Sequence, residues 1–153
     1  MRYKIACVGR IKEDYLTQII EEDRKAVNRH DELIICEVPD EQIPRKASDK
    51  VNARIINTEA QKLKNVIEND EYIIALCIEG RKTTREDLRK QIVKAENLGR
   101  NTVTFVIGGS LGLDPEITQR ADYKMSVSEM TFPHQLMRAA LVEQIMLISG
   151  EMV

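Results

Sequence analysis

Five short apolar runs, each about the length of a β-strand, are spaced along the chain. They are rich in Ile, Val, Leu and Ala, and several end at a glycine or a proline, which are typical strand ends. Runs that are apolar at nearly every position are typical of strands buried on both faces of a sheet. The predicted strands are residues 3–8, 33–38, 72–78, 102–107 and 123–127.

The segments between these runs have apolar residues three and four positions apart among charged ones, which is the pattern of an amphipathic helix. Ser48 is suited to cap the second of these helices, and Thr84 with Glu86 and Asp87 places acidic residues in the first turn of the third. Pro133 is expected to open the last helix. The other predicted helices cover about 15–27, 51–67, 84–99 and 115–120.

Strands and helices alternate throughout, which predicts an α/β fold with a mostly parallel sheet and helices on both faces. Residues 1–153 are expected to form one domain, because no linker, repeat or low-complexity tract divides them. Aromatic residues make up only 4% of the chain and Trp is absent, so the core has to be built from Ile, Leu, Val, Ala and Met.

Charge and cysteine content argue against several classes of protein, although a substrate presented by a larger partner stays open. The net charge of −2 lacks the basic excess that usually marks a general nucleic-acid binder. No apolar run approaches the length of a membrane span and no signal peptide is evident, so we expect a cytoplasmic protein. The two histidines and three cysteines match no zinc spacing, and no metal is expected. Cys7, Cys36 and Cys77 each lie inside an apolar run, which predicts buried, reduced thiols.

A cluster of three glycines follows the fourth predicted strand, at Gly108, Gly109 and Gly112. Loops at the carboxyl ends of parallel strands are where open α/β sheets bind ligands. A dinucleotide fingerprint is disfavoured, because Ile107 stands where its first glycine would be and the motif normally follows a first strand. A phosphate-binding Gly-Lys-Ser/Thr ending is also missing. A tight turn that binds nothing stays open as an alternative.

Two other predicted strands end in comparable loops. Residues 76–81 place a glycine and Arg81 past the third strand, and residues 126–134 form an irregular segment after the fifth. The three loops are expected to converge on one pocket, where free N–H groups at the start of the last helix could bind an anion or a carbonyl. Arg81 and Lys82 either contact RNA phosphates or belong to a solvated loop.

Three strings in and after these loops resemble one family. Residues 105–113 (FVIGGSLGL), 126–138 (SVSEMTFPHQLMR) and 141–144 (LVEQ) are similar to the ribosomal RNA large subunit methyltransferase H family, small enzymes of the SPOUT class. The resemblance runs from the N-terminus, including residues 38–41, to about Gln144.

The resemblance implies a fold, a reaction and a cofactor. The fold would be a SPOUT (α/β knot) sheet whose C-terminal part forms a trefoil knot, in a homodimer with the active site at the subunit interface. The reaction would transfer a methyl group from S-adenosylmethionine to N3 of a pseudouridine in 23S rRNA within the assembled ribosome. The implied cofactor-binding residues are Leu76, Gly108, Val127, Ser128, Glu129, Met130, Thr131 and Phe132.

Methylation at N3 requires a group that accepts the N3 proton or stabilises the resulting anion. His134 is the candidate base and Arg138 the candidate clamp for a phosphate or anion. The alternatives are that His134 only hydrogen-bonds the backbone at a helix start and that Arg138 forms an interface salt bridge. Glu143 is expected to be structural.

The chain departs from the family pattern in two places. Cys77 stands where relatives commonly have an acidic residue. After Ile145, about four residues of the family pattern are missing, and its Tyr-His ending is not found. Either the chain is interrupted between Ile145 and Met146, or a continuous helix is four residues shorter. The shorter form favours an alternative function, a catalytically silent module that binds S-adenosylmethionine or docks on ribosomes.

Overall fold

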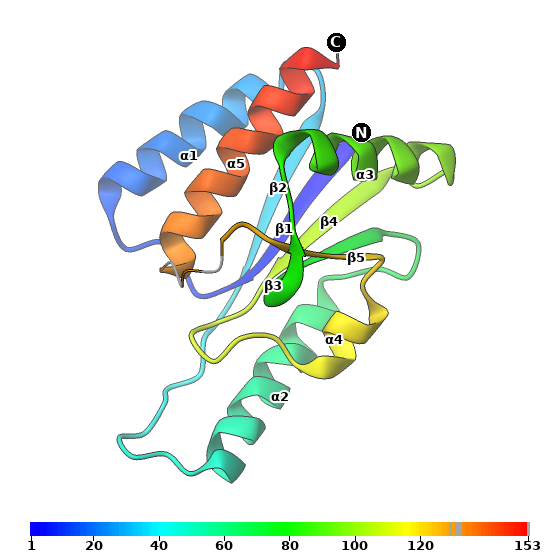
Figure 1. Ribbon diagram of the computed structural model, residues 1–153. Helices are drawn as coiled ribbons and strands as arrows, with labels where there is room; N and C mark the ends of the chain where they lie inside the picture. Colours follow the sequence, from blue (N-terminus) through cyan, green and yellow to red (C-terminus); the bar gives the residue numbers. More distant parts are fainter. Residues whose placement is uncertain (129, 131–132, 153) are drawn as a thin grey trace.

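The computed structural model describes residues 1–128, 130 and 133–152, and a five-stranded sheet forms their centre (Figure 1). Every strand pairs in parallel with its neighbours, and the strand order is β2-β1-β4-β3-β5. The predicted parallel α/β sheet is therefore confirmed. The strands are β1 (Arg2–Val8), β2 (Glu32–Val38), β3 (Tyr72–Lys82), β4 (Thr102–Ile107) and β5 (Tyr123–Ser126).

The helices begin close to where local sequence signals predict. The Ser48 side chain accepts a hydrogen bond from the Val51 N–H, and Thr84 and Asp87 form a reciprocal capping box, so both predicted caps are confirmed. The helices are α1 (Asp14–Val27), α2 (Asp49–Asn65), α3 (Arg85–Asn97), α4 (Pro115–Arg120) and α5 (His134–Glu151).

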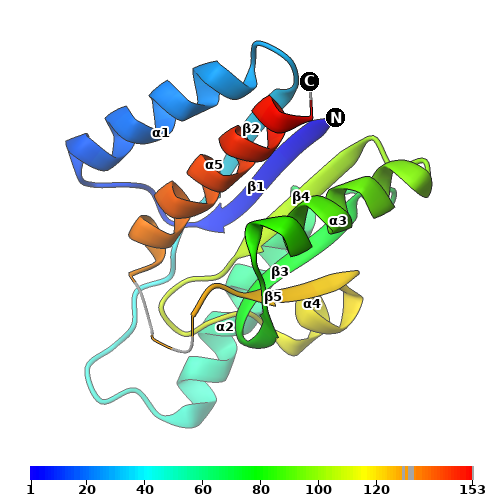
Figure 2. The same ribbon diagram turned by 45° about the horizontal axis from the view of Figure 1, so that its top comes forward.

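Helices cover both faces of the sheet, as the two views in Figures 1 and 2 show. On β1, Tyr3, Ile5 and Cys7 face α1, α3 and α5 in the larger part of the core. Ala6 and Val8 face the opposite side, where α2 and α4 pack. This alternation buries nearly the whole strand, because successive side chains point to opposite faces.

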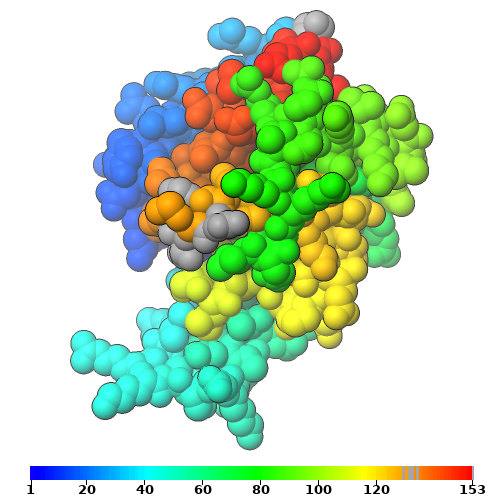
Figure 3. Space-filling view, viewed as in Figure 1, coloured from blue at the N-terminus to red at the C-terminus, as the bar shows by residue number. Residues whose placement is uncertain are grey.

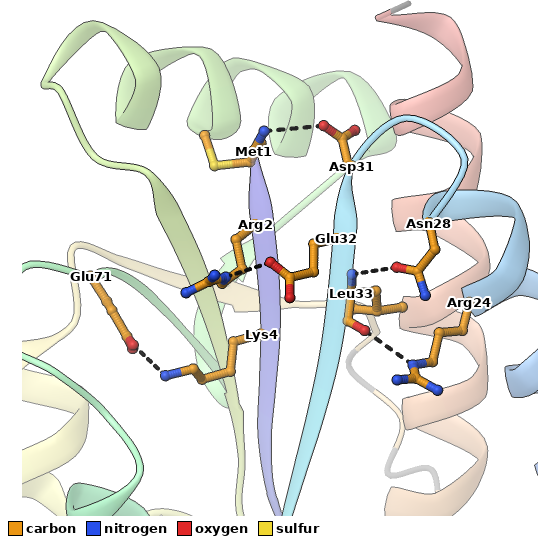
Figure 4. A network of polar contacts seen from close by, with 9 residues as sticks. All are labelled: Met1, Arg2, Lys4, Arg24, Asn28, Asp31, Glu32, Leu33 and Glu71. Atoms are coloured by element: carbon orange, nitrogen blue, oxygen red, sulfur yellow. Dashed lines mark hydrogen bonds and ion pairs between the residues drawn. The ribbon is translucent and has the colours of Figure 1, made fainter.

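Polar contacts fix the amino ends of the strands (Figure 4). Lys4 reaches from β1 to the buried carboxylate of Glu71, which also accepts a 2.6 Å hydrogen bond from the Thr104 hydroxyl. Asn28, just after α1, accepts the Leu33 N–H at 2.8 Å and so orients the start of β2. These contacts lie at the edge of the sheet opposite to the carboxyl ends of the strands.

Strand β3 is longer than predicted. The apolar signal ends at residue 78, yet the strand resumes pairing at Arg81, so that Leu76 and Arg81 both pair with Met125 of β5. Gly80 allows this close return, because a Cβ there would lie 2.6 Å from the Met125 carbonyl carbon. Residues 77–80 are thereby displaced from the β3–β5 ladder as a bulge. No local sequence pattern predicts this bulge.

Helix α5 is continuous through Ile145 and Met146. Of the two alternatives at this point, the structure therefore has the continuous helix. The helix packs along α1, through Val142, Ile145 and Ile148 among others in the core (Figure 2). The trefoil knot stays a prediction.

Candidate functional site

A cavity of about 760 Å³ opens at the carboxyl ends of β3, β4 and β5. It is lined by residues 76–79, 107–113 and 125–128, together with Met130, Pro133 and Met137. The predicted convergence of the three loops is thus confirmed. In Figure 3 the green end of β3 and the orange segment after β5 lie together on the face shown. The size is typical of small-molecule sites.

The glycine loop after β4 folds tightly upon itself. The Gly112 N–H donates to the Gly109 carbonyl at 3.0 Å, and Gly112 has a φ of +89°, which favours glycine. A Cβ on Gly108 would lie 2.7 Å from the Gly112 carbonyl carbon. A side chain is therefore excluded at Gly108, while Ser110, Leu111 and Leu113 line the cavity beside it.

A buried carboxylate supports the glycine loop from behind. Glu59 of α2 is only 5% exposed, and its Oε2 accepts the Glu41 N–H at 3.1 Å. Burial raises the pKa of the Glu59 carboxyl. Our sequence reasoning missed this residue. The available signal was a glutamate four positions from both Ile55 and Leu63, on the apolar stripe of the helix.

Short hydrogen bonds shape the segment after β5. The Ser126 hydroxyl donates to the Ser128 carbonyl at 2.9 Å, and the Met130 N–H donates to the Ser128 hydroxyl at 3.0 Å. Five of the predicted cofactor residues line the cavity, and Glu129, Thr131 and Phe132 lie outside the described residues. The five are Leu76, Gly108, Val127, Ser128 and Met130.

Of the two predicted catalytic residues, His134 directly follows a residue that lines the cavity, whereas Arg138 lies outside the lining. His134 begins α5 directly after the cavity-lining Pro133, and only its backbone is described. Arg138 is 1% exposed and does not line the cavity. Its guanidinium donates to Glu37 Oε2 at 2.6 Å and to the Gly9 carbonyl at 3.0 Å. These contacts lie within one chain and join α5 to the ends of β1 and β2.

The three cysteines are free thiols that differ in burial. Cys7 is fully buried, and burial raises its pKa to about 12. Cys36 and Cys77 are only half-buried, so the expectation of a buried thiol is confirmed for Cys7 alone. Cys77 lines the cavity, and burial, followed by the nearby Glu79 charge, raises its pKa.

Neither a metal-binding cluster nor a membrane-spanning helix is found among the described residues. They contain no group of three or more His, Cys, Asp or Glu side chains that could hold a metal ion. Within the same ranges, no helix is long and apolar enough to cross a membrane.

A cavity beside a glycine loop at the carboxyl edge of a parallel sheet is where α/β proteins typically bind small molecules. Residues 1–147 match the family model described as "Predicted SPOUT methyltransferase". This chain belongs to the SPOUT methyltransferase family.

Two relatives match nearly the whole chain. The chain is 44% identical to the ribosomal RNA large subunit methyltransferase H of Bifidobacterium animalis subsp. lactis (strain AD011), over 95% of this chain and 91% of the relative. It is 42% identical to the ribosomal RNA large subunit methyltransferase H 1 of Clostridium perfringens (strain SM101 / Type A), with the same coverage of both chains.

Proposed function

We propose that this chain transfers a methyl group from S-adenosylmethionine to N3 of a pseudouridine in 23S rRNA, within the assembled ribosome. The observation that carries the proposal is the cavity itself, where Leu76, Gly108, Val127, Ser128 and Met130 meet from three strand ends. The names of the two relatives support large-subunit ribosomal RNA as the substrate.

The cavity lining fits the donor molecule. Adenine is flat and apolar with a polar edge, so Leu76 and Met130 suit its faces, while backbone groups of the glycine loop suit its edge. The bound donor supplies a methyl group already activated by its sulfonium. The protein has chiefly to align that methyl group with the nucleophile and to exclude other acceptors.

The N3 proton has to leave during the reaction. We assign its acceptance to His134, which follows the cavity-lining Pro133 at the start of α5. Arg138 would have to release Glu37 before it could clamp an RNA phosphate. Its contacts with Glu37 and Gly9 better support a positioning role, in which it anchors the first turns of α5 beside the cavity.

We also propose that the active unit is a homodimer with a site completed by the second copy. Large apolar side chains are exposed on the packed helices α1 and α5, at Tyr15 (62%), Ile19 (44%) and Leu136 (43%). Contiguous exposed apolar patches commonly mark interfaces, and these three side chains come from two helices that pack side by side.

The decisive experiment combines two measurements on the full chain. Ribosomes lacking the modification are incubated with S-adenosylmethionine labelled in its methyl group, and the label is located by mass spectrometry of 23S rRNA fragments. Calorimetry measures donor binding separately. Label at N3 of a pseudouridine supports the proposal. Donor binding without transfer would indicate the silent module, and absence of donor binding would overturn both functions.

A further inference from the structure

One acidic side chain belongs to the described lining of the cavity, and the proposed function gives it no role. Glu79 lines the cavity together with Cys77 and Ile78, and it is exposed to solvent. The remaining described lining residues are apolar, glycine, serine or cysteine, and burial keeps the Cys77 thiol neutral by raising its pKa. Among the described residues that line the cavity, therefore, Glu79 carries the formal negative charge.

The backbone holds Glu79 in this position by a specific device. Leu76 and Arg81 both pair with Met125, so residues 77–80 bulge out of β3 toward the cavity. Gly80 lies so close to the Met125 backbone that no side chain fits there, which fixes the end of the bulge. Bulges beside functional sites commonly re-aim a side chain in this way.

Among the described residues, Glu79 forms no ion pair with a base. The ion pairs found there involve other carboxylates, such as Glu37 with Arg138 and Glu86 with Arg89. Glu79 also acts on the Cys77 thiol, since its charge is the second cause of the raised Cys77 pKa. Its field is thus felt inside the cavity, and the opposing effect of Lys124 on the same thiol is smaller. A cleft lined by one sign of charge concentrates ligands of the opposite sign.

Methyl transfer changes the charge of the bound molecule. S-adenosylmethionine carries a positive sulfonium, whereas its product S-adenosylhomocysteine has a neutral thioether at the same sulfur. The two are otherwise alike, so shape distinguishes them only by one methyl group. A negative charge near the cavity attracts the donor more than the product.

We propose that Glu79 is a specificity-determining residue that makes the cavity bind the sulfonium donor in preference to the thioether product. This inference rests on the proposed function. Because the side chain is exposed, water and salt screen its field, and the expected effect on relative affinity is about two- to fivefold. The consequence is easier replacement of product by fresh donor.

The test compares donor and product binding by calorimetry at low salt in four full-length proteins: wild type, Glu79→Gln, Glu79→Asp and the control Glu86→Gln. Glu86 is an exposed glutamate on α3 that does not line the cavity. Glu79→Gln is expected to weaken S-adenosylmethionine binding about two- to fivefold and S-adenosylhomocysteine binding less. Glu79→Asp and Glu86→Gln should keep the wild-type ratio of affinities.

Salt provides a second measurement. The wild-type preference for the donor should shrink as ionic strength rises, and that of Glu79→Gln should change little. An equal loss of donor and product affinity in Glu79→Gln, or an unchanged ratio, would overturn the role of Glu79. If wild type binds neither molecule, the proposed function fails before this inference is reached.

Discussion

The carboxylate of Glu59 lies directly against Gly109, so that a Cβ on this glycine would come within 2.9 Å of Oε1. Helix α2 and the cavity wall thus meet at one contact between a buried acid and a residue without a side chain. The absence of a side chain at Gly109 allows this close approach, and its φ is not among the positive ones.

Gly109→Ala should therefore push the glycine loop away from Glu59. We expect a loss of about 1–3 kcal/mol in the free energy of unfolding, because overpacking forces neighbouring groups to shift. Donor binding should weaken as well. Gly150→Ala is the control, since nothing lies within 4 Å of a Cβ at this helical position. It should be neutral or stabilising by up to about 1 kcal/mol.

Urea denaturation and calorimetry measure these effects. In the double variant Gly109→Ala with Glu59→Ala, the new methyl group has room, so the two losses should not add. Strictly additive losses would show that the contact between Glu59 and Gly109 is unimportant.

Glu59→Gln should change how stability depends on pH. Burial raises the Glu59 pKa above its ordinary value of 4.5, so the folded protein holds this proton more tightly than the unfolded chain does. The contribution of this carboxyl to the free energy of unfolding is therefore largest below pH 4.5 and falls as pH rises through the folded pKa. At neutral pH the folded protein bears the full cost of holding the ionised carboxylate in a buried position.

Glutamine does not titrate, so the stability of Glu59→Gln relative to wild type should increase as pH rises through this window. Urea denaturation from acidic to neutral pH measures the difference. A difference that stays constant with pH would contradict the assignment. Glu68→Gln, at an exposed glutamate, serves as the control.

The cysteines should react with iodoacetamide at distinct rates. With a pKa of about 12 and no exposed surface, Cys7 should be alkylated only when the protein unfolds. Cys77 lines the cavity and should react in the folded state, more slowly once S-adenosylmethionine is bound. Mass spectrometry locates the label. Cys36 is the internal control, because equal protection of Cys36 would mean general stabilisation and not occupation of the cavity.

Arg138→Met should destabilise the fold by about 1–3 kcal/mol, because the Gly9 carbonyl and the Glu37 carboxylate lose their donor. Glu37→Gln should cost less, since Glu37 is 41% exposed. Denaturation and methyl transfer are measured on both variants. Wild-type stability of Arg138→Met combined with lost transfer would contradict the anchoring role and support direct contact with RNA.

Local signals in the sequence predicted most of the fold. Ser48 and Thr84 mark helix starts because their side chains bond backbone groups only three residues away. The strand at residues 102–107 and the helix at 115–120 were predicted with their observed limits, since a glycine cluster and an Asp-Pro pair bound them.

The features that were missed depend on residues distant in sequence. The resumed pairing of β3 after Gly80 depends on Met125 lying beside it. The role of Glu59 depends in the same way on its contact with Gly109. Arg138 could be read from the sequence as a clamp for RNA, because its partners Glu37 and Gly9 are more than a hundred positions away. The expected pocket was found because parallel strands bring their carboxyl ends to one edge.

The pairing of Gly80 beside Met125 also sets how the chain tolerates changes in length. An inserted or deleted residue within 77–79 would either shift Arg81 and Lys82 by one place along β5, turning each side chain to the opposite face, or force the bulge to absorb the change. Variation among natural homologues at this point should therefore appear as exchanged residues at fixed spacing, and grafted sequences should keep the number of residues between Leu76 and Gly80.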